Sequence, residues 1–202
     1  MTELKSIFNS EFIETLEQIT KEGIENAAKG FSGMLGKTLE VKKSSARLVN
    51  ILEITHLIGG PEDETVAIYL RAEGSIAGQM MLVLQFESAM ELVDLLMGEA
   101  IGSTKKLETM EKSALQELGN VTGTYFLNSV SEITGSSVRP TPPAVMVDMF
   151  GAIIDIVIVT TGGEQEEVLL IEAEFVLGKQ IAEIQFWVIP DPASLKTFEF
   201  KY

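Results

Sequence analysis

The sequence predicts an α+β protein in which one mainly antiparallel sheet is covered by two long helices. Three observations favour this fold. Residues 2–35 and 107–135 carry apolar side chains at roughly helical intervals, and each segment stops at a glycine. Two pairs of short apolar runs, each pair joined by a glycine-containing turn, are typical of β-hairpins. The same order of elements then occurs twice along the chain.

In the first half, the helical segment 2–35 stops at Gly36, and LEVKKSS after it has an extended character. Residues 46–58 are ambiguous between a short helix and a strand, and an acidic loop with glycine and proline follows. The runs TVAIYLRA and IAGQMMLVLQF flank Gly74 and predict a hairpin. An amphipathic helix, ESAMELVDLLM, then ends at Gly98.

The second half begins after a polar linker at 99–106, and its long helix starts near Leu107 and ends at Gly135. SSVRP is predicted to be extended, and the prolines beyond it exclude a helix. The very apolar AVMVDMFGAIIDIVIV is interpreted as a short helix that runs into a strand. EEVLLIEAEFVL and QIAEIQFWVI flank Gly178 and Lys179 and predict the second hairpin, after which DPASLKTF starts like a capped helix.

The repeated order indicates an internal duplication with a pseudo-two-fold arrangement. Gly36 and Gly135 align the long helices with an offset of 99 (135 − 36), and Gly74 and Gly178 align the hairpin turns with an offset of 104 (178 − 74). We therefore predict a single domain, 1–202, made of two repeats at about 1–100 and 101–202, whose hairpins share one sheet. The alternative is that unrelated α+β proteins show a loosely similar order of elements.

Composition excludes several functions. The chain has no cysteine, which removes disulfides, thiolate catalysis and cysteine-ligated metals and is compatible with a reducing cytoplasm. Its N-terminus lacks the unbroken apolar core of a signal peptide, so we expect it to stay in the mature protein. A formal net charge of −15 disfavours nucleic acid and anionic lipid, and no charge-free stretch suits membrane insertion. No motif indicates a metal cluster, a phosphate-binding glycine loop or a nucleophilic triad.

Some residues have ordinary structural interpretations. His56 is the only histidine and lies among apolar residues, so it is interpreted as structural rather than catalytic. Trp187 and the scattered methionines are interpreted as core. Gly119 and Gly123 each cost a helix about 1 kcal/mol relative to alanine, so they need a reason. Either a partner or the other long helix approaches closely there, or helix packing alone explains them.

The helix at 107–135 places Ser113, Glu117 and Asn120 on one exposed strip, because an ideal helix advances about 100° per residue and these three fall within roughly 60°. Apolar residues cluster on another side, which is expected to pack. A glutamate and an asparagine three residues apart usually mark only a solvated face. The wider spacing says more: three residues separate Ser113 from Glu117, two separate Glu117 from Asn120, and 22 separate Asn120 from Pro143.

This spacing, together with ALQELGNVTGTYFLNSV and PTPPAVMVDM, resembles the signature of the CheC, CheX and FliY family of bacterial chemotaxis phosphatases, which dephosphorylate the response regulator CheY. The resemblance covers nearly the whole chain and implies an internally duplicated CheC-like fold. It implies a cytoplasmic hydrolase for the aspartyl phosphate of a CheY-type regulator, with Asn120 positioning a water and Glu117 pairing with the partner's lysine. Ser113 and Pro143 would support them. The partner would supply the divalent metal, Mg²⁺, so the chain is expected to need no cofactor of its own.

Such proteins carry a second copy of the motif near the N-terminus. By the offset of 99, its three positions are occupied here by Glu14, Gln18 and Lys21, so we predict a degenerate first site and one working site. Asp148 lies in a VDMF stretch that matches a family segment contacting the deamidase CheD, which makes CheD a second candidate partner. The alternative for Asp148 is that it caps a short helix.

Two other functions stay open. The chain could be a non-catalytic module that binds CheY or CheD, since the family's fold is similar to the middle domain of the flagellar switch protein FliM. Scaffolding alone requires none of the motif residues, which argues against this alternative. The substrate could also be a receiver outside chemotaxis, because docking on a particular receiver leaves no local motif.

Overall fold

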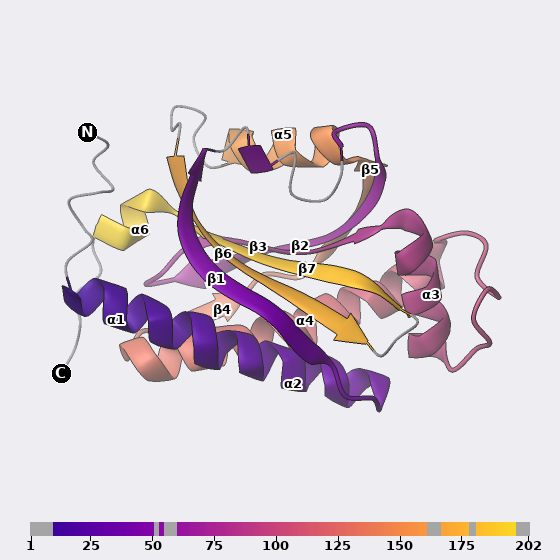
Figure 1. The fold of residues 1–202 in the computed structure, drawn as a ribbon, viewed down its shortest axis with the longest axis horizontal. Helices are drawn as coiled ribbons and strands as arrows, with labels where there is room; N and C mark the ends of the chain where they lie inside the picture. The colour runs from indigo at the N-terminus through magenta and orange to yellow at the C-terminus, as the bar shows by residue number, and fades with distance from the viewer. Residues whose placement is uncertain (1–9, 51–52, 55–59, 161–166, 178–180, 197–202) are drawn as a thin grey trace.

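The computed structural model describes residues 10–50, 53–54, 60–160, 167–177 and 181–196. Within these residues, seven strands form one sheet in which every pairing is antiparallel (Figure 1). The strands are β1 (Glu40–Asn50), β2 (Glu64–Gly74), β3 (Gly78–Gln85), β4 (Val138–Pro140), β5 (Ala144–Met149), β6 (Glu167–Leu177) and β7 (Ile181–Pro190). Their order is β1-β6-β7-β3-β2-β4, and β5 also pairs with β2.

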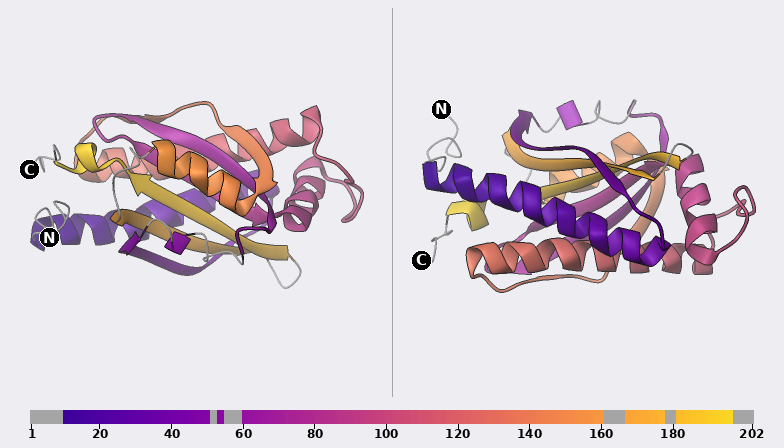
Figure 2. Two further views of the ribbon diagram at one scale, coloured as in Figure 1. Left: turned by 90° about the horizontal axis from the view of Figure 1, so that it is seen from above. Right: turned by 60° about the horizontal axis from the view of Figure 1, so that its bottom comes forward.

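Helices cover both faces of this sheet. Figures 1 and 2 show α1, α2 and α4 across one face, α5 on the other face and α3 at one end. The helices are α1 (Ser10–Gln18), a π-helical turn η2 (Ile19–Gly23), α2 (Ile24–Leu35), α3 (Phe86–Met97), α4 (Thr109–Thr134), α5 (Phe150–Thr160) and α6 (Pro192–Lys196). The predicted α+β architecture with two long helices over an antiparallel sheet is confirmed.

The sheet order is symmetric about its centre. β7 and β3 pair at the middle, their hairpin partners β6 and β2 flank them, and β1 and the β4–β5 segment form the edges. The strands that precede the hairpin in each half pair with the hairpin of the other half: β1 pairs with β6, and β4 and β5 pair with β2. The hairpins of both halves therefore share one sheet, as a duplicated unit with a pseudo-two-fold axis requires.

Contacts between the long helices repeat with the predicted offset. A Cβ atom on Gly30 would lie 2.8 Å from the ring of Tyr125. On the same two helices, Asn26 Nδ2 donates to Ser129 Oγ at 2.7 Å. Adding 99 to position 30 gives 129, and subtracting 99 from position 125 gives 26, so an exchange of the halves maps one contact onto the other.

Two core layers follow from the two covered faces. Between the helices and the sheet, Phe126 and Phe186 meet edge-on with ring centroids 5.4 Å apart. Beneath α5, Phe150 and Trp187 meet with centroids 5.8 Å apart, and both are fully buried. Trp187 is therefore core, as predicted. The methionines divide: Met80 and Met81 are buried, whereas Met110 and Met149 are exposed, which corrects their assignment to the core.

The prediction for residues 144–160 had its elements in the wrong order. Ala144–Met149 is a strand paired with β2, and Phe150–Thr160 is a helix. The β-branched residues of this helix would favour a strand in isolation. They form a helix because Phe150, Ile153, Ile154 and Val157 share one buried side against the sheet. Tertiary burial therefore overrides the local propensity.

Other predictions are resolved in part. Residues 46–50 continue β1, and residues 53–54 form a short 3₁₀ turn. The rest of 46–58, including His56, and the turn at Gly178 and Lys179 lie outside the described residues. Among the helices of the described chain, none is long and apolar enough to cross a bilayer.

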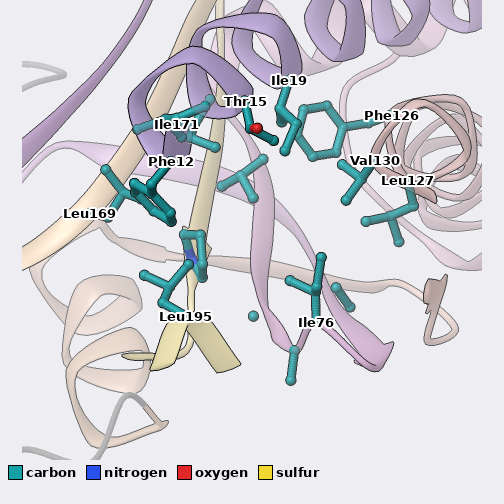
Figure 3. Close-up of a pocket in the computed structure, with 16 residues that line it drawn as sticks. Phe12, Thr15, Ile19, Ile76, Phe126, Leu127, Val130, Leu169, Ile171 and Leu195 are labelled. Atoms are coloured by element: carbon teal, nitrogen blue, oxygen red, sulfur yellow. The ribbon is translucent and has the colours of Figure 1, made fainter. Parts of the chain in front are cut away.

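A small apolar cavity lies between α1, the C-terminal half of α4, α6 and the β2–β3 turn (Figure 3). Its lining includes Phe12, Ile19, Phe126, Leu127 and Leu195. The cavity meets α4 at Phe126, six residues beyond Asn120, which is less than two helical turns from the polar strip.

Candidate active site

The start of α4 is set by its own sequence. Glu108 precedes the helix in extended conformation and forms a reciprocal capping box with Glu111. The Glu108 amide donates to Glu111 Oε2 at 3.0 Å, and the Glu108 side chain accepts from the backbone of Glu111. At the other end, Gly135 adopts a left-handed φ of 64°, so the helix stops there as predicted.

The connection before α4 is anchored by a buried carboxylate. Asp94 on α3 accepts backbone hydrogen bonds from Gly102 at 2.6 Å, Ser103 at 3.1 Å and Thr104 at 2.7 Å. Burial by itself would raise the pKa of Asp94, but a side-chain hydrogen bond with Thr104 and these backbone bonds favour the charged form and together hold the pKa below its ordinary value. The polar linker is thereby tied to α3.

Gly119 and Gly123 let α4 approach the sheet. Both are buried, and a Cβ on Gly119 would collide with Ile68 of β2. A Cβ on Gly123 would lie 2.5 Å from Leu70 Cδ1 on the same strand. Packing of the helix on the sheet explains both glycines. The suggested approach of a partner or of the other long helix is wrong, because these glycines face β2.

The predicted strip lies along an open groove. Ser113, Glu117 and Asn120 line it from α4, together with Gln116, and Pro140, Pro142 and Pro143 form the opposite side. Ser113 and Glu117 are exposed, and Asn120 is half-buried. The structure therefore brings all four residues of the predicted signature, including the distant Pro143, to one place.

The side chains in the groove differ in their hydrogen bonding. Ser113 Oγ donates to the Thr109 carbonyl at 2.8 Å, a local bond within the helix. In the described part of the chain, the side chains of Glu117 and Asn120 have no hydrogen-bond or ion-pair partner. A carboxylate and a carboxamide thus lie on the same face of one helix.

The proline side of the groove is held from two directions. Thr141 and Arg71 of β2 exchange two bonds: the Thr141 amide donates to the Arg71 carbonyl at 2.8 Å, and the Arg71 amide donates to Thr141 Oγ1 at 2.9 Å. From the helix, Gln116 Nε2 donates to the Pro143 carbonyl at 3.0 Å. Sequence reasoning missed Gln116, although it lies one helical turn before Asn120.

Comparisons with known proteins find similarity to CheC. The CheY-P phosphatase CheC of Bacillus subtilis (strain 168) is 29% identical over 154 residues, which cover 74% of each chain. The sequence model of the CheC-like family matches residues 110–147, which hold the whole strip and Pro143. The chain therefore resembles the CheC-like family, most specifically in the segment that carries the strip.

Solved structures share the fold of this CheC-like chain. The crystal structure of FliY from Thermotoga maritima matches with a TM-score of 0.67 at 19% identity, covering 95% of both chains. A CheX–CheY–BeF₃–Mg²⁺ complex from Borrelia burgdorferi matches with a TM-score of 0.52 at 15% identity, covering 84% of this chain and 96% of that one.

The counterpart of the strip in the first half of the CheC-like chain has a different surrounding. Glu14, Gln18 and Lys21 are all exposed, as the offset predicts for strip positions. Gln18 Nε2 donates to Glu22 Oε1 at 3.1 Å, and Lys21 lies in the π-helical turn η2. The residues that match the proline turn by the same offset, 41–44, contain no proline and belong to the continuous strand β1.

Asp148 lies apart from the groove, at the end of β5. It pairs with Thr65 in the sheet, is exposed, and accepts a hydrogen bond at Oδ1 from the Met149 amide at 2.8 Å. Met149 beside it is 58% exposed. The two side chains form an accessible corner of the CheC-like fold, and the role of Asp148 as a contact for CheD stays a prediction.

Among the described residues, no group of three or more histidine, cysteine, aspartate or glutamate residues is placed to hold an ion. The groove of this CheC-like chain offers an amide, one carboxylate and a hydroxyl. Such a set can orient water and pair with a cation of a partner.

Proposed function

We propose that this chain hydrolyses the aspartyl phosphate of a CheY-type response regulator in the groove between α4 and the proline turn. The observation that carries the proposal is a pair of side chains, Glu117 and Asn120, that have no polar partner among the described residues and lie on a surface open enough to receive another protein. Similarity to the CheY-P phosphatase CheC supports the reaction class. The CheX–CheY complex of the same fold supports a receiver as the partner.

Asn120 is the group that positions the water in this proposal. Its amide oxygen accepts from the water while its NH₂ group can donate, and the amide brings no charge toward the anionic phosphoryl group. The water oxygen bonds to phosphorus as the bond between phosphorus and the aspartyl oxygen breaks. The aspartate leaves as a carboxylate, and the released phosphate carries the water's protons. An aspartyl phosphate is already activated, so placement in line is the main requirement.

Glu117 has a docking role in the same scheme. As a general base it would bring a negative charge close to the phosphoryl oxygens, which is electrostatically costly. An ion pair with the lysine of the receiver avoids this cost and orients the partner over Asn120. Ser113 extends the polar surface, and Pro143 shapes the opposite rim.

The divalent metal of the reaction is assigned to the receiver. Mg²⁺ would screen the phosphoryl oxygens from the receiver side. In this proposal the one carboxylate of the groove, Glu117, pairs with the partner's lysine and not with a metal. The side chains of this protein then only position the water and dock the receiver.

Phosphate release from a panel of purified, phosphorylated receivers tests the proposal. Each receiver is phosphorylated in Mg²⁺ with a small phosphodonor, and inorganic phosphate is followed with and without this chain. We expect faster release with at least one chemotaxis receiver. Binding of a receiver without any acceleration across the panel would instead identify a non-catalytic binding module.

A further inference from the structure

Gln116 joins two segments that are far apart in sequence. Its Nε2 donates to the Pro143 carbonyl at 3.0 Å, 27 positions away. Gln116 also lines the groove beside Glu117 and Asn120. The bond therefore links the helix that carries the polar strip to the rim on the other side of the same groove.

The proline turn has few other ways to be held. Three of its four residues, 140–143, are prolines, which lack the backbone N–H that a sheet ladder needs. Thr141 is the remaining amide, and it is used on Arg71 of β2. The β2–β5 ladder resumes only at Ala144. Pro143 thus lies between two points of attachment to β2, and its tie to α4 comes from Gln116.

Gln116, the donor, lies on the same side of α4 as Asn120. Positions 116 and 120 are four residues apart, so their side chains are neighbours about 6 Å apart along one side of the helix. One side of the helix therefore presents the Asn120 amide to the partner and, through Gln116, holds the rim on the opposite side of the groove. On the sheet side, a Cβ on Gly119 would lie 3.5 Å from Pro143, so the rim also packs closely on the helix there.

We propose that Gln116 is a positioning residue, which holds the Pro143 rim at a set distance from Asn120 so that a docked receiver meets both at once. This inference rests on the proposed phosphatase function. A receiver seated against helix and rim together has its phosphoryl group placed relative to the Asn120 amide. When the tie is lost the rim can shift, and the water is then misplaced although both contact surfaces remain.

Two substitutions separate the hydrogen bond from the bulk of the side chain. Gln116→Met keeps the length and removes the donor, whereas Gln116→Lys keeps a donor that can reach the Pro143 carbonyl. Asn128→Met is the matched control, because Asn128 is an exposed residue of the same helix outside the groove. All variants are compared by thermal melting, so that loss of fold is distinguished from loss of positioning.

In the phosphate-release assay we expect Gln116→Met to lower kcat about ten-fold and to change KM by less than about two-fold, since small misplacements act on the chemical step more than on binding. Gln116→Lys should recover most of kcat, and Asn128→Met should match the unmodified chain. Full kcat in Gln116→Met, or no recovery in Gln116→Lys while the fold is kept, would overturn the positioning role.

A second readout does not depend on catalysis. The backbone amides of Thr141 and Ala144 lie on either side of Pro142 and Pro143, and their ¹⁵N relaxation reports the mobility of the rim. We expect greater mobility at both in Gln116→Met and none of this change in Asn128→Met. If the unmodified chain releases no phosphate from any receiver, the phosphatase proposal fails, while this measurement still decides whether Gln116 holds the rim.

Discussion

Asn120 tests the chemistry at the scale of one residue. Replacing it with alanine removes the amide that orients the water but leaves the surrounding surface. We expect Asn120→Ala to lower accelerated phosphate release by roughly 100-fold or more, because positioning is the main contribution of this chain. Binding to a BeF₃-activated receiver, measured by titration calorimetry, should stay within about three-fold. Normal turnover by this variant would contradict the proposal that Asn120 positions the water.

Glu117 should behave differently, because its proposed contact is an ion pair with the partner. Glu117→Ala is expected to raise KM by roughly five- to ten-fold, the size of one interfacial charge pair, with a smaller effect on kcat. Glu117→Gln serves as the control for side-chain length. The wild-type rate should also be flat across neutral pH, since an amide does not titrate. A bell-shaped profile centred near neutrality, or a loss confined to kcat in Glu117→Ala, would point to a general base instead.

At the scale of elements, the approach of α4 to β2 depends on Gly119. Alanine would add helix propensity worth about 1 kcal/mol, but its Cβ would strike Ile68, and overpacking of this kind costs about 1–3 kcal/mol. We therefore expect Gly119→Ala to lower the free energy of unfolding in urea, and to slow phosphate release by shifting the strip.

Gly33→Ala is the matched control for this substitution. Gly33 lies in α2, is exposed, and a Cβ there would meet nothing within 4 Å. It should stabilise the protein by about 0.5–1 kcal/mol, because only the backbone entropy changes. Stabilisation by both alanines would show that the space at Gly119 adapts and that the contact with β2 is not tight.

Asp94 controls the element before α4, and its effect should depend on pH. Its folded-state pKa is lowered, so its contribution to stability is present above the unfolded pKa, near pH 4, and is lost as the pH falls through the folded value. Asp94→Asn should cost about 1–3 kcal/mol at neutral pH, since it weakens hydrogen bonds to a charged acceptor. The difference from wild type should shrink toward pH 3 in urea unfolding.

Asp155→Asn provides the comparison, because Asp155 is an exposed residue of α5. Its substitution should change the free energy of unfolding by less than about 0.5 kcal/mol at neutral pH. A penalty for Asp94→Asn that stays constant from neutral pH to pH 3 would contradict the role of the charged form.

At the scale of the whole molecule, two related halves should carry one working site. Gln18→Ala changes the first-half counterpart of Glu117, an exposed residue bonded only locally to Glu22 among the described residues. We expect phosphate release within about two-fold of wild type and stability within about 0.5 kcal/mol, as for an ordinary surface position. A large loss of kcat in Gln18→Ala would assign a function to the first site.

Features that depend on neighbours in sequence could be predicted, whereas features that depend on contacts distant in sequence could not. Ser113, Glu117 and Asn120 share one helix, so helical periodicity alone predicted their common strip. The hairpins were predicted because alternation and glycine turns are local signals. The strand predicted where α5 lies was wrong. Its β-branched residues favour a strand, and the helix is favoured only because Ile153, Ile154 and Val157 are buried against the sheet. No local pattern carries that information.

The groove itself depends on contacts that span the chain. Spacing and family resemblance linked Pro143 to Asn120, but the strand pairing of β2 with β4 and β5 is what carries the proline turn beside α4. The reason for Gly119 and the role of Gln116 followed only from that packing, since each concerns a neighbour distant in sequence. Local periodicity is enough to place side chains along one helix. The distance between that helix and the opposite rim is set by sheet register, close packing and one long-range hydrogen bond, which exist only in the folded chain.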